Sequence, residues 1–179
     1  MRQWQGLTDG PAEGGPALPS TAVRVSLDAG DVEQAARALG RDYRLEGSVV
    51  PGDQRGRQLG YPTANVQPVA SSAVPADGAY AGRLLLWTGP GGGTVTALPA
   101  AISIGTNPTF SGAERRVEVH VLDLAGGPPP HLDLYGEHVG VEFVARLRGI
   151  RRFSSVDELL QQLAIDVQRT RELLASRPL

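Results

Sequence analysis

The stretch from Gly47 to Asn65 combines the residue types that bind phosphate groups. Its glycines let backbone N–H groups approach a ligand closely and form an anion-binding concavity. Its arginines carry planar charged groups that bind phosphate through paired hydrogen bonds. We therefore predict a loop that binds nucleotide phosphates, with a plain hairpin loop and solvated arginines as the alternative. The candidate phosphate-binding residues of the loop are Gly52, Arg55, Gly56, Arg57 and Gly60.

A hydroxyl and an amide follow this loop, in the sequence Tyr-Pro-Thr-Ala-Asn. Thr63 and Asn65 are two positions apart, so on a strand their side chains point to the same face. Two oxygen ligands side by side suit Mg²⁺, which keeps several waters and takes further ligands from substrate phosphates. We predict that Thr63 and Asn65 form an oxygen-only half-site for Mg²⁺. The alternative is that these two residues only close a turn.

A carboxylate lies on an alternating stretch further along the chain, Val-Glu-Val-His at 117–120. Glu118 and His120 share one face of the predicted strand, and the valines share the other. A carboxylate beside Mg²⁺ and a substrate hydroxyl is the expected general base for phosphoryl transfer to an alcohol. Glu118 is therefore the predicted catalytic residue, and His120 is either a second candidate base or a spectator. If the valines face the core of a sheet, Glu118 is an ordinary solvated residue.

The composition excludes several kinds of enzyme. The chain has no Cys, so a thiol nucleophile, a disulfide framework and a Cys-bound zinc site are excluded. All 17 basic residues are arginine. Without lysine the chain holds neither a Walker-A loop, nor the strand lysine of a protein kinase, nor a Schiff-base lysine.

Length and charge narrow the class further. A chain of 179 residues with 41% hydrophobic residues forms one globular domain with a real core. The net charge of −2 argues against a nucleic-acid partner. No apolar run is long enough to span a membrane, and no secretory signal is present, so we expect a cytoplasmic protein.

Short β-rich runs separated by Gly/Pro loops must position these residues. No helices lie between the runs, which argues against a parallel βαβ sheet and favours a mainly β barrel or sandwich of six antiparallel strands. The predicted strands span 43–50, 63–67, 79–87, 94–104, 116–124 and 139–147.

Helices are predicted at the two ends of this β-rich region. Ser155 and Glu158 form a capping box that opens a long helix to about Ala175. A short helix follows Asp31 and stops at Gly40. Residues 1–20 are rich in Gly and Pro, and we predict a disordered arm. The predicted inner face of the long helix comprises Val156, Leu159, Leu160, Leu163, Val167, Thr170 and Leu174.

Six motifs in one order resemble those of the riboflavin kinases. The first is the Gly47–Asn65 segment, which matches the family pattern from its first glycine to its Pro-Thr-Ala-Asn box. One such box alone would be weak, but six ordered matches over roughly residues 43–175 are specific. The other five are Pro75–Tyr80, Gly105–Phe110, Val117–His120, Asp133–Gly136 and Leu147-Arg148.

The resemblance implies a six-stranded antiparallel Greek-key barrel with a C-terminal α-helix. It implies transfer of a phosphoryl group from ATP to the 5′-hydroxyl of riboflavin, giving FMN and ADP with Mg²⁺ as cofactor. Thr63 and Asn65 match the family's metal- and phosphate-binding pair, and Glu118 matches its base. The flavin ring would lie beside Arg148 and Phe153. We expect all three reacting side chains to converge on one cavity at the barrel mouth.

Two departures from the family leave alternatives open. Residues 149–152 are Gly-Ile-Arg-Arg, where many members carry acidic residues, so a kinase for a modified flavin is one alternative. A flavin-binding regulator without turnover is the other. No nucleotidyltransferase motif is present, so FAD synthesis is not predicted. We divide the chain into the arm at 1–20, a helical linker or module remnant at 21–42, and a kinase domain at 43–179. We expect a monomer.

Overall fold

The computed structural model describes residues 20–52, 55–88, 93–109, 112–123 and 132–177. The arm predicted for residues 1–20 lies outside these ranges, apart from Ser20, which begins a helix. Within the described ranges, none of the helices is long and apolar enough to cross a membrane.

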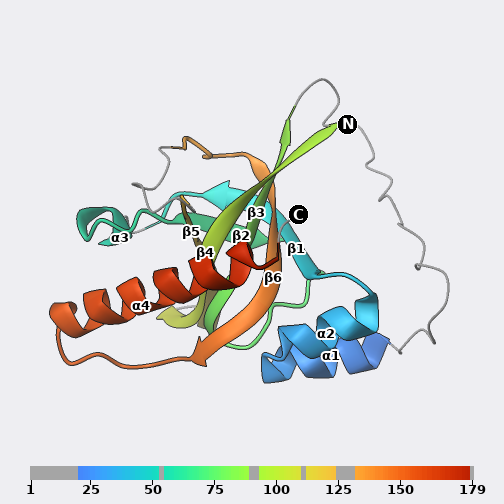
Figure 1. Cartoon of the computed structure of the whole chain (residues 1–179), viewed down its shortest axis with the longest axis horizontal. Coiled ribbons are helices and arrows are strands. Elements are labelled where there is room, and N and C mark those ends of the chain that lie inside the picture. Colours follow the sequence, from blue (N-terminus) through green and yellow to red (C-terminus); the bar gives the residue numbers. More distant parts are fainter. Residues whose placement is uncertain (1–19, 53–54, 89–92, 110–111, 124–131, 178–179) are drawn as a thin grey trace.

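Six antiparallel strands close into a barrel, which Figure 1 shows with its flanking helices. The strands are β1 (Tyr43–Val50), β2 (Ala64–Pro68), β3 (Gly78–Thr88), β4 (Thr94–Thr109), β5 (Gly112–Val121) and β6 (His138–Gly149). Their order around the barrel is β1-β2-β5-β4-β3-β6. Because β6 returns to lie beside β3 of the consecutive β3-β4-β5 meander, the connection is a Greek key. The predicted six-stranded barrel is confirmed.

Alternate residues of the strands fill the barrel with apolar side chains. Val66, Val117 and Val119 are each at most 3% exposed. Tyr80 and Phe143 pack edge to face, with their ring centroids 5.4 Å apart. Burying a side chain of this kind contributes roughly 1.5–3 kcal/mol. The residues between the buried ones point outward, so the polar residues of β2 and β5 lie on the outer wall.

The C-terminal helix α4 (Val156–Ala175) lies across the outside of β3 and β4 (Figure 1). The predicted cap is present, because the Ser155 side chain accepts a hydrogen bond from the Glu158 N–H at 3.1 Å. The Glu158 carboxylate in turn accepts from the Ser154 N–H and hydroxyl, which lowers its pKa. These contacts fix the first turn of the helix.

The predicted inner face of α4 is only half correct. Val167, Thr170 and Leu174 are buried against the barrel, whereas Val156 is 55% exposed. The three leucines between them are only half-buried. The reason is geometric, since the N-terminal half of the helix extends past the barrel wall, on the left in Figure 1. The apolar face of α4 is therefore longer than the surface of β3 and β4 on which it packs.

Two N-terminal helices pack beneath the barrel in Figure 1. The predicted helix is α2 (Val32–Leu39), with Asp31 as its N-cap and Gly40 in the left-handed conformation at its end, so that prediction is confirmed. A second helix, α1 (Ser20–Ala29), was not predicted. Its residues Val23 and Leu27 join the hydrophobic core of the barrel, so α1 and α2 are part of the packed unit.

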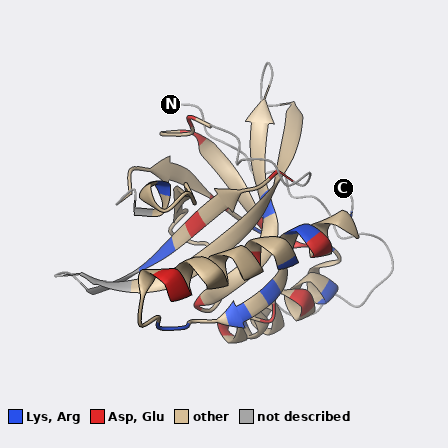
Figure 2. Ribbon diagram, turned by 60° about the vertical axis from the view of Figure 1, so that its left-hand side comes forward, with Lys and Arg blue, Asp and Glu red and all other residues tan. Residues whose placement is uncertain are grey.

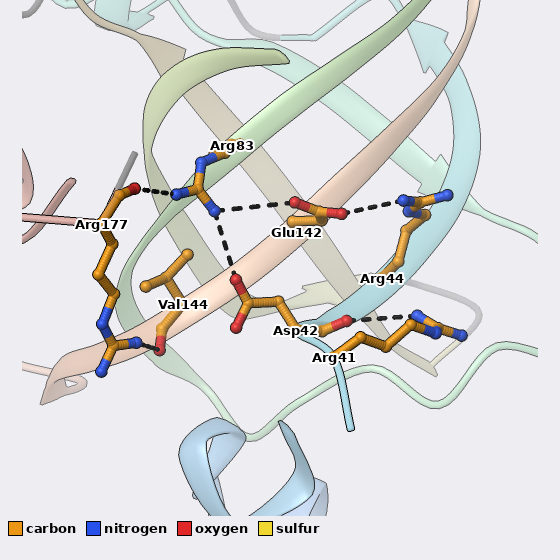
Figure 3. Close-up of polar contacts among 7 residues, drawn as sticks. All are labelled: Arg41, Asp42, Arg44, Arg83, Glu142, Val144 and Arg177. Atoms are coloured by element: carbon orange, nitrogen blue, oxygen red, sulfur yellow. Dashed lines mark hydrogen bonds and ion pairs between the residues drawn. The ribbon is translucent and has the colours of Figure 1, made fainter. Parts of the chain in front are cut away.

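A network of charges on the outer wall joins β1, β3, β6 and the end of α4, as Figure 3 shows. Glu142 lies between two arginines: Arg44 at 3.0 Å and Arg83 at 3.9 Å. Arg83 is 8% exposed and also binds the Asp42 carboxylate at 3.3 Å. Its guanidinium donates a further hydrogen bond to the carbonyl oxygen of Arg177, after α4. The network therefore ties the C-terminal end of α4 to the barrel.

Charges of both signs are interspersed elsewhere. Figure 2 shows acidic and basic segments alternating along α4 and the strands beside it. This distribution agrees with the small net charge of −2.

Candidate active site

The predicted amide and the predicted base meet on the outer wall of the barrel. In the pairing of β2 with β5, Asn65 lies directly opposite Glu118. Residues directly opposite on antiparallel strands have their Cβ atoms about 4.5–5.5 Å apart and share a face. The valines beside them fill the core, so this face is the outer one. Asn65 also pairs with Val50, the last residue of β1, so it lies near one end of these strands with its side chain directed outward. A shared cavity at the barrel mouth stays a prediction.

The Gly-rich loop lies over Asn65 and the neighbouring Thr63. A Cβ added to Gly52 would be 2.0 Å from the amide nitrogen of Asn65, so the loop backbone contacts that side chain directly. A Cβ on Gly56 would lie 3.6 Å from the hydroxyl oxygen of Thr63. Only glycine permits the approach at Gly52. Thr63 and Asn65 thus lie beneath the loop, and both are half-buried.

The described part of the loop, from residue 55 onward, is not irregular throughout. It contains one helical turn, α3 (Arg55–Gln58), which lies at the left of the barrel in Figure 1. A hydrogen bond from the Tyr61 N–H to the Gly56 carbonyl oxygen, at 2.8 Å, closes the turn. Gly60 follows α3 in the left-handed conformation, with a φ of 82°. Arg57 is exposed, and the side chain of Arg55 lies outside what the structure describes.

His120 connects the strand of Glu118 to the segment before Thr63. Its Nδ1 lies 2.7 Å from the Pro62 carbonyl oxygen, an acceptor, so Nδ1 carries the proton. Its ring centroid lies 5.3 Å from that of Tyr61. Burial lowers the pKa of His120, and the guanidinium of Arg171 lowers it further, against the raising effect of the bond to Pro62. His120 therefore holds the Tyr61–Pro62 segment in place as a neutral side chain.

The row that contains Asn65 and Glu118 continues across three more strands. Ser103 on β4 is opposite Glu118, Ala79 on β3 is opposite Ser103, and Arg148 on β6 is opposite Ala79. Neighbouring strands are about 4.8 Å apart, so the row from Asn65 to Arg148 spans about 19 Å of the wall. Because the barrel is closed, this row runs around the wall, and β6 is only two strands from β2 by way of β1.

The oxygen atoms at one end of this row fit a hard cation. Thr63, Asn65 and Glu118 offer a hydroxyl, an amide oxygen and a carboxylate, with no sulfur or imidazole ligand. Among the described residues no group of three or more His, Cys, Asp or Glu forms a metal cage. A site with few protein oxygens suits Mg²⁺ shared with substrate phosphates rather than a closed protein site. The residues present therefore fit the predicted metal.

The family model for riboflavin kinase, named Flavokinase, matches residues 39–174. This range covers all six strands and nearly all of α4. The chain belongs to the riboflavin kinase family.

Curated relatives of this riboflavin kinase family member carry a second named activity. The present chain is 40% identical over 160 residues to the bifunctional riboflavin kinase/FMN adenylyltransferase of Escherichia coli K12. It is 38% identical over 159 residues to the protein of the same name from Pseudomonas fluorescens. These alignments cover 89% and 88% of this chain but 47% of each relative. The chain thus spans about half the length of the curated relatives that it matches.

Solved structures share the fold of this riboflavin kinase family member. Riboflavin kinase from Trypanosoma brucei aligns with a TM-score of 0.53 at 27% identity, over 75% of this chain and 80% of that one. A Streptococcus pneumoniae structure named as a macrolide-efflux protein aligns with a TM-score of 0.75 at 36% identity. It covers 89% of this chain and 48% of that one. We draw no function from its name.

The predicted flavin-side residues of this riboflavin kinase family member take part in contacts between β6 and α4. Arg148 binds the Asp166 carboxylate through two nitrogens, at 2.9 and 2.8 Å, and Asp166 is 4% exposed. The ring of Phe153 lies beneath the guanidinium groups of Arg148 and Arg151, at 5.8 and 5.7 Å. Arg148 therefore anchors α4 beside Phe153, and a contact of either residue with flavin stays a prediction.

Sequence reasoning missed Asp166, the partner of Arg148. A carboxylate next to Val167 on the inner face of an amphipathic helix is a usable signal, because a buried charge needs a partner. Gln162, one turn earlier, also donates to Asp166 at 2.9 Å. The partner could not be identified from sequence, since Arg148 lies 18 residues away across a loop.

A cavity of about 410 Å³ lies between α4 and β6. It is lined by Arg146, Leu147, Arg169, Glu172, Leu173 and Ser176, and none of the predicted site residues is among them. The row from Asn65 to Arg148, rather than this cavity, holds the residues that the riboflavin kinase family motifs indicate.

Proposed function

We propose that this chain transfers the γ-phosphoryl group of ATP to the 5′-hydroxyl of riboflavin, giving FMN and ADP. The observation that carries the proposal is the pairing of Asn65 with Glu118 beneath the Gly-rich loop, in a member of the riboflavin kinase family. Thr63, Asn65 and Glu118 are all present, which favours turnover over non-catalytic flavin binding.

Glu118 is the proposed general base. Its carboxylate takes the proton of the 5′-hydroxyl while that oxygen bonds to the γ-phosphorus and the bond from this phosphorus to the ADP oxygen breaks. The cross-strand distance to Asn65 supports this role, because the acceptor hydroxyl and the γ-phosphate must meet within a few ångströms. With no lysine in the chain, other groups must stabilise the charge of the transition state.

The loop above the pair is the proposed phosphate cradle. Backbone N–H groups near Gly52, Gly56 and Gly60, with Arg55 and Arg57, would hold the phosphates of ATP. Thr63 and Asn65 would hold Mg²⁺ and the phosphate oxygens. When bound, this metal would neutralise part of the negative charge of the phosphates.

The flavin ring is the group that we propose to bind beside Arg148 and Phe153. This placement rests on the Leu147-Arg148 motif, because β6 is three strands from β5 in either direction around the closed barrel. The exposed N-terminal half of α4 supports the same position, because it leaves apolar surface beside Phe153.

Product formation tests the proposal directly. The chain is incubated with riboflavin, ATP and Mg²⁺, and FMN is followed by chromatography, with Glu118→Gln as the matched control. We expect FMN from the wild type and at least about a hundredfold less per unit time from the variant. Tight riboflavin binding without FMN would favour a binding protein. A higher kcat/KM for ring-substituted flavins than for riboflavin would contradict the named substrate.

We further propose a kinase domain at 43–179 that acts as a cytoplasmic monomer without a nucleic-acid partner. The helical segment at 21–42, predicted as a linker, packs on this domain through α2. Light scattering after size exclusion measures the mass, and a dimer would contradict the monomer.

A further inference from the structure

We propose that Ser103 is a further substrate-binding residue, whose hydroxyl binds the ribityl chain of riboflavin. The inference rests on the proposed function and adds a specific contact to it. Ser103 lies directly opposite Glu118 in the pairing of β4 with β5, so the two side chains are neighbours on the outer wall.

The part of the substrate beyond its reacting hydroxyl extends from Glu118 toward Ser103. On one side of Glu118 lies Asn65, covered by the Gly-rich loop and assigned to the phosphates. The remainder of the acceptor alcohol must therefore leave toward the other side. The next residue of the row on that side is Ser103, followed by Ala79 and Arg148.

Exposure along the row limits this path to Ser103. Ala79 is 6% exposed, and it faces outward toward the side of β3 that α4 covers. Glu118 and Asn65 are half-buried at the other end. Ser103 is exposed, whereas its neighbours in the row are half-buried (Glu118) or buried (Ala79).

The chemistry of β4 at this point also favours a polyol. The outward positions on either side of Ser103 are Ala101 and Gly105, whose side chains offer no hydrogen-bonding group. The Ser103 hydroxyl is both donor and acceptor, as are the hydroxyls of a ribityl chain. Neighbours with little bulk leave space for the carbon chain. Ser103 would thus position the chain so that its terminal hydroxyl reaches Glu118.

A matched pair of variants isolates the hydroxyl. Ser103→Thr keeps the hydroxyl, whereas Ser103→Val has nearly the same shape as threonine and lacks it. We expect KM for riboflavin to be about three- to tenfold higher for the valine than for the threonine variant, with KM for ATP equal in the two. Thr96→Val, which removes an exposed hydroxyl elsewhere on β4, is the control and should leave both KM values unchanged.

Deoxy analogues of riboflavin identify the bonded group. Each analogue lacks the 2′-, 3′- or 4′-hydroxyl and keeps the reacting 5′-hydroxyl. We expect the difference between the two Ser103 variants to disappear for one analogue and persist for the others. Equal kcat/KM of the two variants for riboflavin, or an equal difference with every analogue, would overturn the role of Ser103.

A binding titration separates this inference from the proposed function. Riboflavin fluorescence reports binding to the wild type and to both Ser103 variants without turnover. If the wild type binds riboflavin but forms no FMN, the kinase proposal fails, while a weaker affinity of the valine variant still supports Ser103. If FMN forms and the two variants bind riboflavin equally, only the Ser103 inference fails. An absence of both binding and FMN rejects both.

Discussion

Two carboxylates on the outer wall of the barrel differ in their cross-strand neighbours. Glu142 on β6 is flanked in register by Arg44 on β1 and Arg83 on β3, and it forms ion pairs with both. Glu118 on β5 is flanked in register by an amide, Asn65, and a hydroxyl, Ser103. Glu142 therefore has charged cross-strand neighbours, whereas those of Glu118 are neutral and polar.

The difference indicates different tasks for one residue type. A carboxylate between two arginines joins the elements that carry its partners. A carboxylate between an amide and a hydroxyl has neighbours that also bind phosphate, metal and sugar oxygens. We infer that the Glu142 network maintains the barrel and the end of α4, whereas the Glu118 row carries out the reaction. Each carboxylate serves as the control for the other.

Glu118→Gln should give the largest effect. The amide keeps the shape of the side chain but is not a base, so kcat should fall by about a hundredfold or more. The free energy of unfolding, measured by urea denaturation, should stay within about 0.5 kcal/mol of the wild type. Unchanged turnover would contradict the role of Glu118 as general base and the functional difference between Glu118 and Glu142.

Glu142→Gln should produce the opposite pattern. Removing one charge leaves Arg83, which is 8% exposed, with one fewer partner. The free energy of unfolding should drop by about 1–3 kcal/mol in urea denaturation. At a temperature where both proteins are folded, kcat should match the wild type. A hundredfold loss of kcat in this variant would show that the network contributes directly to the reaction.

Asn65→Ala should sharpen the comparison at the phosphate end of the row. Loss of the amide oxygen should raise KM for ATP and the Mg²⁺ concentration needed for half-maximal activity, each by about tenfold. Gln67→Ala is the matched control, because Gln67 lies two residues along β2 and is exposed. A wild-type Mg²⁺ titration for Asn65→Ala would contradict the assignment of this residue to the metal.

The strands of this fold could be predicted from the sequence because their alternation is local. The strand 43–50 was predicted at its observed bounds, and the others differ mainly at their ends. The strand β4 runs to Thr109, five residues past its predicted end. Gly105 and Pro108 interrupt the alternation of apolar and polar residues there, but β4 remains paired with β5 as far as Thr109. The helix α1 was missed, and it packs chiefly on α2, with Val23 and Leu27 in the shared core cluster.

The residues of the candidate site could be listed from the sequence, but their arrangement could not. Asn65 and Glu118 are opposite one another only because β2 and β5, which are far apart in the chain, are neighbours in the barrel. That neighbourhood follows from Greek-key closure and not from any local pattern. The same holds for Arg148, whose place at the far end of the row depends on β6 returning beside β3.

The smallest predicted effect concerns His120, which lies on the same strand as Glu118 and is buried. Burial lowers its pKa below the ordinary value of 6.5, and the Arg171 guanidinium acts in the same direction. Above about pH 6.5 this histidine is neutral in both the folded and the unfolded chain, so it adds no pH dependence. Below that pH the unfolded chain binds the proton more readily, so the folded state loses stability as the pH falls toward the folded-state pKa.

Urea denaturation of the wild type and of His120→Gln between pH 7.5 and 5 tests this prediction. Other groups titrate in both proteins, so the quantity of interest is the difference between their free energies of unfolding. This difference should shift against the wild type below about pH 6.5, by less than about 1.4 kcal/mol per pH unit, the limit for one proton. A constant difference across the range would show that His120 gains its proton as readily in the fold as outside it. The hydrogen bond to Pro62 would then outweigh burial, and the neutral ring would no longer explain how the Tyr61–Pro62 segment is held.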